Sequence, residues 1–320
     1  MHSKHKEPSH SQPAKASKPE MKTEKIYNEL IDVLARQLVT LPDKPEENPN
    51  STLEALWYFS CEAPRNSRGK YEIPLPELDT ASFHKLKKLI KQRIKGTPLA
   101  HIIGRQDFMG VDFLISSGAL IPRRETEILG YGALSKIKAL AQTQPAVKVM
   151  DLCTGMGNLA LAFAYHEPKS LILAADISEP AIQLAQKNAQ HLGLHNQVTF
   201  YTGDMLAPFQ NNGMANTIDV LTCNPPYISN QKVEKMPNEI IKYEPPEAFQ
   251  GGPFGLNIIF RLMKEALPFI KRDGWLCFEV GLGQGEGLMK MMEKNDHFNK
   301  IESAKDDNEK IRAIFAQIHK

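Results

Sequence analysis

Apolar residues in the first third of the chain follow a helical repeat. Between residues 26 and 38, and again between 83 and 94, they recur three and four positions apart, which places them on one face of a helix. Ser51 and Glu54 form a candidate capping box in front of a third apolar run. The pattern predicts a small helical domain over residues 25–100.

The pattern changes after residue 100. Residues 101–122 form a connector with strand-like pieces, among them the alternating run 111–115. From about residue 147, short apolar runs alternate with helical segments. The strand candidates are Val147–Leu152, Leu171–Ala175, Val198–Tyr201, Ile218–Cys223 and Trp275–Val280. This alternation predicts an α/β domain over residues 123–320, with a mainly parallel sheet and helices on both faces.

Composition narrows the class of protein. Residues 1–24 are rich in Lys, His, Ser and Pro, so we expect a disordered basic tail. A net charge of only +2 argues against a protein that binds nucleic acid through a global positive field. Four widely spaced cysteines show no metal-ligand spacing and indicate reduced thiols. Because the chain has no signal-peptide core and no apolar stretch near the roughly 20 residues that span a bilayer, we expect a cytoplasmic protein.

The most informative local feature is the sequence Asn224-Pro225-Pro226-Tyr227, which follows the strand candidate Ile218–Cys223. Two consecutive prolines cannot extend a strand or continue a helix, so the chain must turn there. The turn would present a side-chain amide, two fixed carbonyls and an aromatic ring at the end of a sheet. Such a set suits a planar nitrogen, because the carbonyls accept its N–H bonds and the ring covers its flat face.

A second feature is a glycine-containing turn after the first strand of the alternating region. It follows Asp151 and consists of Cys153, Thr154, Gly155, Met156 and Gly157. Glycines between a strand and a helix let a ligand approach the backbone, and ligands of parallel sheets bind beyond the carboxyl ends of the strands. The second strand ends in Asp176, which can bind two vicinal ribose hydroxyls. The third leads to Asp204, whose carboxylate could accept the adenine amino group.

These residues alone fit either a dinucleotide or S-adenosylmethionine. A dinucleotide site places its glycines as G-x-G-x-x-G, whereas this turn has only Gly155 and Gly157 after Asp151. The spacing favours the sulfonium cofactor, which would place a methyl donor beside Asn224.

Several segments match one known family together. They are the Asn224–Tyr227 turn, the glycine turn, Leu120-Ile121-Pro122-Arg123 with Glu125-Thr126-Glu127, and Glu244-Pro245 with Gly251-Gly252 and Gly255-Leu256. Together they resemble the HemK/PrmC family, the protein-glutamine methyltransferases that modify peptide chain release factors. The resemblance covers about residues 25–318. The Asn-Pro-Pro-Tyr motif alone is shared with adenine and other amino-group methyltransferases, so the other segments make the match specific.

The resemblance implies a Rossmann-like, seven-stranded class I methyltransferase domain, which a hairpin joins to a helical N-terminal domain that helps to hold a release factor. The implied reaction transfers a methyl group from S-adenosylmethionine to the side-chain amide nitrogen of the glutamine in the Gly-Gly-Gln loop. Family cofactor positions fall on Cys153–Gly157, Asp176, Met205 and Asn224, and substrate positions on Asn224–Tyr227.

Four places depart from the family pattern. Cys153 stands where glycine is usual, Arg124 replaces a usual proline, Met205 replaces a common aromatic residue, and Val280–Gln284 matches only loosely. Because cysteine is small, the turn can survive if the φ angle at Cys153 is negative. None of these departures removes a group that the chemistry needs.

The expected mechanism uses the turn as a rigid acceptor of hydrogen bonds. An amide nitrogen is a poor nucleophile because its lone pair is delocalised. Asn224 Oδ1 and the Pro225 carbonyl would each accept one of its N–H bonds and direct the lone pair toward the methyl group. Tyr227 would pack on the amide plane, while Pro225 and Pro226 keep the acceptors fixed.

Other polar residues have weaker claims to a role in the site. Arg123 and Glu125 are further substrate-binding candidates, with a structural ion pair as the alternative. For Glu279 and His101, a structural or solvated role is favoured over catalysis. Cys223 is better explained as a small buried residue at a strand end than as a nucleophile, since no histidine lies nearby in the sequence.

Three alternative functions stay open. The chain could methylate a glutamine of another protein, such as a ribosomal protein. In a nucleic-acid amino methyltransferase, Tyr227 would stack on a flipped base, but the charge balance and the helical front domain fit that class less well. A non-catalytic scaffold would not need the intact Asn224 motif. We expect a monomer that binds release factors, with no metal, membrane or direct nucleic-acid partner.

Overall fold

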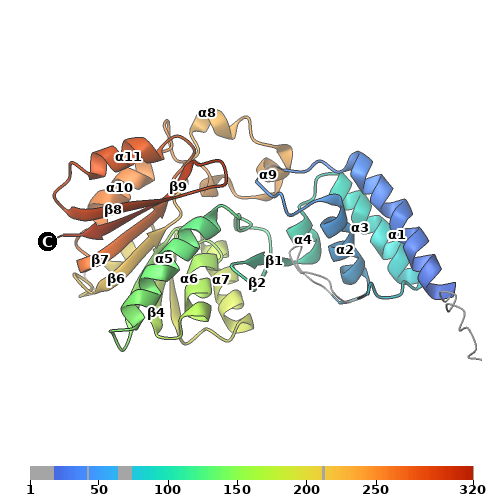
Figure 1. Ribbon diagram of the computed structural model, residues 1–320, viewed down its shortest axis with the longest axis horizontal. Coiled ribbons are helices and arrows are strands. Elements are labelled where there is room, and N and C mark those ends of the chain that lie inside the picture. Colours follow the sequence, from blue (N-terminus) through green and yellow to red (C-terminus); the bar gives the residue numbers. More distant parts are fainter. Residues whose placement is uncertain (1–17, 42, 64–73, 211–212, 320) are drawn as a thin grey trace, which may run out of the picture.

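The computed structural model describes residues 18–41, 43–63, 74–210 and 213–319. Figure 1 shows a bundle of helices, formed by the N-terminal third of the chain, beside a larger part built on one twisted sheet. A short two-stranded hairpin lies between them. This arrangement is the two-part organisation that the change of periodicity near residue 100 predicts.

Within the described residues, the N-terminal bundle consists of helices α1 (Lys18–Gln37), α2 (Pro49–Ser60), α3 (Thr80–Ile94) and α4 (Leu99–Ile103). Their apolar stripes face one another and form a core of their own, around the buried Leu34, Trp57 and Leu86. The Trp57 indole N–H donates to the Pro76 carbonyl at 2.8 Å, so this large side chain is buried without leaving its donor unpaired.

The start of the first helix differs from the expectation. Helix α1 begins at Lys18, so residues 18–24 are helical although they belong to the segment predicted to be disordered. Residues 1–17 of that segment lie outside the described residues.

The predicted capping box at Ser51 and Glu54 is wrong. Helix α2 begins earlier, at Pro49, and its N-cap residue is Asn48. The Asn48 side chain accepts a hydrogen bond from the Ser51 backbone N–H at 3.1 Å. Asparagine at the N-cap followed by proline at the first helical position is a favourable helix start, so this pair determines where the helix begins.

The connector contains the hairpin implied by the family resemblance. Strands β1 (Arg105–Phe108) and β2 (Val111–Leu114) pair antiparallel around Met109 and Gly110. Both turn residues have positive φ angles, 52° and 77°, which suits the twist of a two-residue hairpin turn. The Leu114 N–H donates to the Asn188 side chain at 2.8 Å, which fixes the hairpin to the sheet domain.

The larger part has a seven-stranded sheet in the order β5-β4-β3-β6-β7-β9-β8. Its strands are β3 (Val147–Leu152), β4 (Ser170–Asp176), β5 (Val198–Thr202), β6 (Ile218–Cys223), β7 (Ile270–Glu279), β8 (Phe298–Lys305) and β9 (Ile311–Ile318). Strands β3 to β7 run parallel, while β9 is antiparallel to both of its neighbours. The five predicted strands are confirmed, and the sheet is the Rossmann-like, seven-stranded sheet of the expected fold class.

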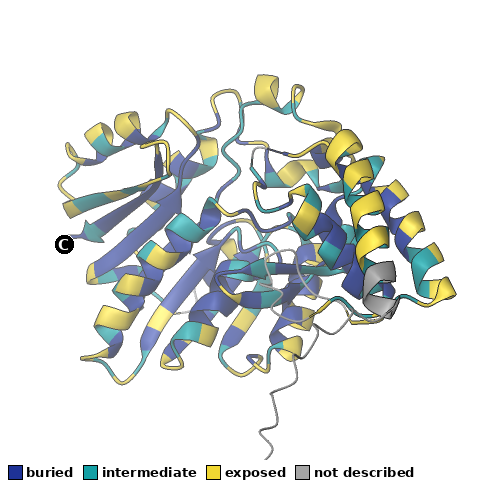
Figure 2. Ribbon diagram, turned by 45° about the vertical axis from the view of Figure 1, so that its right-hand side comes forward, coloured by how far each residue is buried: buried dark blue, intermediate teal, exposed yellow. Residues whose placement is uncertain are grey.

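Helices cover both faces of this sheet (Figure 1). On one face lie α5 (Thr126–Ala141), α6 (Asn158–His166) and α7 (Glu179–His191), and on the other α10 (Asn257–Glu265) and α11 (Gly285–Met292). Figure 2 shows that the central strands are buried between these layers, and every residue of β6 is buried. Among the described residues, no helix is long and apolar enough to cross a membrane.

Residues 228–256, here called the post-turn segment, connect β6 to α10. The segment contains the short helices α8 (Asn230–Val233), α9 (Asn238–Tyr243) and η2 (Pro246–Ala248). Ile240 and Phe249 of the segment share an apolar cluster with Leu41, which follows α1. The post-turn segment therefore lies against the N-terminal bundle and brings the bundle close to the sheet edge that carries the turn after β6 (Figure 1).

Candidate active site

The glycine turn lies at the carboxyl end of β3, as predicted. Gly155 and Gly157 have positive φ angles of 56° and 82°, so both need the freedom of glycine. Cys153 also has a positive φ angle, 53°, so the condition of a negative angle there is not met. The turn keeps its form because a β-carbon is strained there but not excluded, at a cost of about 1–2 kcal/mol.

Buried Asp151, near the end of β3, holds the glycine turn through its side-chain hydrogen bonds. Its carboxylate accepts hydrogen bonds from Thr154 Oγ1 at 2.5 Å and from Thr222 Oγ1 at 2.6 Å, so it links the ends of β3 and β6. Burial raises the pKa of Asp151 to about 6, against the lowering effect of these two hydroxyl groups. The residue holds the glycine turn and the strand before Asn224 in one arrangement.

Asp176, at the end of β4, is tied to the same turn. One carboxylate oxygen accepts from the Gly155 N–H at 2.8 Å, and the other accepts from the Ser178 N–H at 2.9 Å. Burial raises the pKa of Asp176, although these backbone donors lower it. A carboxylate oxygen can accept more than one hydrogen bond, so both oxygens keep capacity for ribose hydroxyls.

The turn after β5 carries Asp204 and Met205. Both Asp204 oxygens accept hydrogen bonds from Arg261, at 3.1 and 3.0 Å, so the carboxylate is held by a bidentate pair. Met205 has a φ angle of 50° and is only 5% exposed, and its sulfur lies 3.8 Å from Cys153 Sγ. Two departures from the family pattern, Cys153 and Met205, therefore contact each other in the structure.

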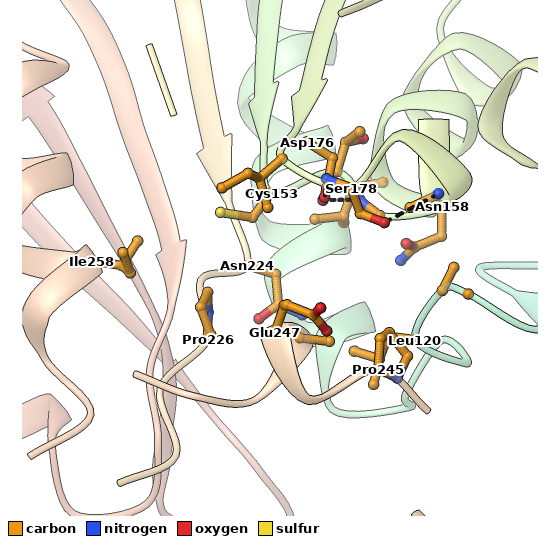
Figure 3. A pocket seen from close by; sticks show the side chains of 18 of the residues that line it. Leu120, Cys153, Asn158, Asp176, Ser178, Asn224, Pro226, Pro245, Glu247 and Ile258 are labelled. Carbon is orange, nitrogen blue, oxygen red and sulfur yellow. Dashed lines mark hydrogen bonds between the residues drawn. The ribbon is translucent and has the colours of Figure 1, made fainter. Parts of the chain in front are cut away.

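The turn after β6 points the Asn224 carboxamide into a cavity at the carboxyl edge of the sheet (Figure 3). Asn224 Nδ2 donates to Thr126 Oγ1 at 3.1 Å, which leaves Oδ1 as the end of the carboxamide that is available to a ligand. Gly251 and Gly255 pack so closely on the backbone of Pro226 and Tyr227 that a β-carbon at either glycine would collide with it. The post-turn segment thus holds the proline turn in place.

Tyr227 is fixed by a buried charge cluster behind the turn. Its hydroxyl donates to Glu279 Oε1 at 2.8 Å, and Arg312 Nη2 lies 3.4 Å from that hydroxyl. Burial raises the pKa of Tyr227 well above its usual value, and the Glu279 charge raises it further. Glu279 therefore has a structural partner next to the candidate site, which agrees with the role favoured from the sequence.

A cavity of about 310 Å³ brings the sequence-predicted residues together. Those that line it are Arg123, Cys153, Thr154, Gly155, Asp176, Asp204, Met205, Asn224 and Pro226. Met156, Gly157, Pro225, Tyr227 and Glu125 do not line it. Figure 3 shows Asp176 and Ser178 across the cavity from Leu120 and Pro245, with Asn224 between them.

Arg123 is occupied by structural partners. Its guanidinium lies 2.6 Å from Glu244 and 3.0 Å from Asp43, and it also donates to the Ile121 carbonyl. Burial lowers its pKa, but the attraction of Glu244 and Asp43 outweighs burial and raises the pKa above its usual value. Although Arg123 borders the cavity, this arrangement favours the structural ion pair over a substrate contact.

Other candidates lie away from the cavity. Glu125 is 3.5 Å from Arg312, so it also belongs to an ion pair. His101 is partly buried, and burial lowers its pKa. Burial raises the pKa of the Cys223 thiol well above its usual value, which keeps it protonated and a poor nucleophile. Neither His101 nor Cys223 lines the cavity, so neither is placed for catalysis.

Sequence reasoning missed several residues that shape the site. Thr126 holds the Asn224 amide, and the Gln284 side chain donates to the Tyr227 carbonyl at 3.2 Å. Leu120, Pro245 and Gln250 line the cavity from the connector and the post-turn segment. The segments around Pro122 and Gly251 that resemble the family could have indicated these residues, because the segments contain or adjoin them.

The sheet order, the two helical layers and the cavity at the carboxyl edge are those of a class I methyltransferase domain. A family model described as "Methyltransferase domain" matches residues 143–317. Release factor glutamine methyltransferase of Thermodesulfovibrio yellowstonii is 36% identical over 231 residues, which cover 72% of this chain and 80% of that protein. The protein of the same name from Geobacter sulfurreducens is 32% identical over 270 residues, which cover 84% of this chain and 90% of that protein. The chain belongs to the family of release factor glutamine methyltransferases.

Solved structures support the fold alone. The catalytic domain of human METTL16 in complex with an RNA hairpin matches with a TM-score of 0.52 at 15% identity, over 66% of this chain and 77% of that one. The N-terminal domain of human METTL16 matches with a TM-score of 0.52 at 14% identity, over 89% of this chain and 99% of that one.

Proposed function

We propose that this protein transfers a methyl group from S-adenosylmethionine to the side-chain amide nitrogen of the glutamine in the Gly-Gly-Gln loop of peptide chain release factors. One observation carries the proposal: the Asn224 carboxamide and the glycine turn border the same cavity. The names of the family relatives support the acceptor.

The residues around the cavity fit the sulfonium cofactor. A β-carbon at Gly155 would meet no atom within 4 Å, so the backbone there is open to a ligand. Asp176 lies at the end of β4, the place where an acidic residue binds ribose hydroxyls. The cofactor would supply an electrophilic methyl group next to Asn224.

Asn224 and Pro225 would act on the acceptor amide. Asn224 Oδ1 and the Pro225 carbonyl accept its two N–H bonds and stabilise the positive charge that develops on the nitrogen as it attacks. The cofactor, held against the glycine turn and Asp176, would supply the methyl group, and the methylated nitrogen would lose one N–H proton to solvent. Gly251 and Gly255 keep the acceptors fixed by packing on the backbone of the turn, so little reorganisation is needed during the reaction.

The N-terminal bundle would help to hold the release factor. The ion pair between Arg93 and Glu239, at 2.9 Å, joins the bundle to the post-turn segment, which contributes Pro245 and Gln250 to the cavity wall, and this link supports such a role. This role would explain why a methyltransferase domain carries a helical domain joined to its substrate edge.

A methylation assay tests the proposal. The purified protein is incubated with methyl-labelled S-adenosylmethionine and a release factor, either native or with the loop glutamine changed to glutamate. Label on the native factor alone is the expected result. Label on both factors would assign another acceptor residue, and label on neither would overturn the proposal and direct the search to ribosomal proteins or nucleic acid.

A binding measurement separates an enzyme from a scaffold. Isothermal titration with S-adenosylmethionine should give heat with a one-to-one end point. An absence of heat would contradict the cofactor assignment, whatever the acceptor is.

A further inference from the structure

Among the described residues, one charged side chain that lines the cavity has no partner. The charged residues of the cavity wall are Arg123, Asp176, Asp204 and Glu247. The first is paired with Glu244, the second accepts backbone hydrogen bonds, and the third is held by Arg261. Within the part of the chain that the structure describes, the exposed Glu247 carboxylate has neither an ion pair nor a hydrogen bond. Glu247 is therefore available to a ligand.

The position of Glu247 places it on the acceptor side of the cavity. The residue lies in η2 of the post-turn segment. Figure 3 shows its side chain on the same side of the cavity as Asn224, with Asp176 on the opposite side. The Ile228 N–H, directly after the proline turn, donates to the Phe249 carbonyl at 2.9 Å. This bond fixes the segment that carries Glu247 to the turn that would hold the acceptor amide.

The chemistry of the carboxylate defines what it can bind. An ionised carboxylate only accepts hydrogen bonds, and it binds positively charged donors most strongly. Its neighbours in the cavity wall include the apolar residues Leu120, Pro245 and Ala248. A single polar group among apolar neighbours commonly fixes the orientation of a ligand. Because glycine has no side chain, the two glycines before the proposed target glutamine leave their backbone N–H groups uncovered for such a contact.

We propose that Glu247 is a substrate-binding residue, which accepts hydrogen bonds from donors of the acceptor loop next to the target glutamine. The donors are backbone N–H groups of the glycines or a cationic side chain of the loop. The inference rests on the proposed function, and it adds to that function a specificity residue outside the Asn224–Tyr227 turn. Glu247 holds the loop, while Asn224 acts on the reacting nitrogen.

Kinetics with both substrates test the inference. Glu247→Ala should raise the KM for the release factor about 10-fold, as expected for the loss of a charge-assisted hydrogen bond, and leave the KM for S-adenosylmethionine nearly unchanged. Glu247→Lys should raise the KM for the release factor further, because an ammonium group repels donors. The melting temperature should stay constant, since neither substitution removes a contact within the described structure. Glu234→Ala, an exposed glutamate of the same segment that does not line the cavity, is the control.

Glu247→Gln distinguishes the two kinds of donor. Glutamine keeps one acceptor oxygen but carries no charge. If the donors are backbone N–H groups, the KM for the release factor should rise only about threefold, because an uncharged hydrogen bond remains. If the donor is a cationic side chain, Glu247→Gln should raise the KM as much as Glu247→Ala does, since the ion pair is lost in both.

The outcomes separate this inference from the proposed function. An unchanged KM for the release factor in both Glu247→Ala and Glu247→Lys would overturn the inference and leave the proposed function standing. Weaker binding of S-adenosylmethionine to Glu247→Ala in isothermal titration, with the KM for the release factor unchanged, would assign Glu247 to the cofactor and also overturn it. If the unmodified protein labels no release factor, the proposed function is overturned, and the inference with it.

Discussion

The guanidinium group of Arg93 in α3 lies 2.9 Å from the carboxylate of Glu239 in α9, 146 residues further along the chain. Its other terminal nitrogen lies 3.0 Å from Glu47, and the Arg93 and Glu47 side chains are each 1% exposed. The ion pairs thus join the N-terminal bundle to the post-turn segment, which contributes Pro245 and Gln250 to the cavity wall. The bundle is therefore connected, through these ion pairs, to the segment that carries these two cavity-lining residues.

Substitution of Arg93 should destabilise the whole protein. Arg93→Met removes the arginine from two buried carboxylates, of which Glu47 keeps only Lys44 at 3.9 Å, and breaking a buried ion pair commonly costs about 3–5 kcal/mol. Urea unfolding monitored by tryptophan fluorescence measures the loss, since Trp57 lies in the bundle core. Arg36→Met is the matched control, because the Arg36 side chain is 79% exposed and lies 4.0 Å from Asp32. Equal unfolding curves for the two variants would contradict a structural role for the buried pair.

Asn224→Ala should abolish methyl transfer and spare most of the cofactor binding. The substitution removes a preorganised acceptor of the amide N–H, and the loss of one such hydrogen bond commonly lowers the rate by about 100-fold or more. Single-turnover methylation and titration with S-adenosylmethionine measure the two effects separately. Asn230→Ala, an exposed position at the start of α8, is the control. Full activity of Asn224→Ala would refute the mechanism.

Strands β3 and β6 could be predicted from the sequence, because both are short apolar runs whose residues are nearly all buried. Strand β8 could not, since it is an edge strand with mostly polar, partly exposed residues and no clear apolar alternation. Strand β7 begins at Ile270 rather than Trp275 because the charged residues between them still extend the strand, although they are not buried. Backbone pairing with β6, in which Ile218 lies opposite Ile270, sets the start of β7.

In the candidate site, too, some features could be predicted from the sequence and others could not. Asn224, Asp176 and Gly155 could be predicted, because each lies within three residues of the end of a predicted strand. The engagement of Arg123 by Glu244, 121 residues away, could not, since nothing local in the sequence pairs them. The contact between Thr126 and Asn224 could not be predicted for the same reason, because 98 residues separate the two in the sequence.

Cys153→Gly should raise the stability of the protein. Glycine adopts the φ angle of 53° without the strain that a β-carbon introduces, so the unfolding free energy should rise by up to about 1 kcal/mol, less the contact with Met205. A rise in the melting temperature measures this gain. Cys223→Gly is the contrasting variant and should lower stability, because Cys223 is fully buried in β6. A lower melting temperature for Cys153→Gly would show that the sulfur contact outweighs the strain.

The raised pKa of Glu279 should make the protein less stable as pH rises toward 7. The pKa of Glu279 is about 7 in the folded protein, whereas the ordinary value, which applies to the unfolded chain, is 4.5. Between pH 4.5 and 7, the folded protein therefore holds a proton that the unfolded chain has released. This contribution is complete below pH 4.5 and is lost as pH rises through 7, by about 3 kcal/mol in all. Glu279→Gln cannot titrate and should flatten the dependence, while the slope from Asp151, whose pKa is raised to about 6, persists. Urea unfolding at several values between pH 5 and 8 measures both curves, and parallel curves would show that Glu279 titrates normally in the folded state.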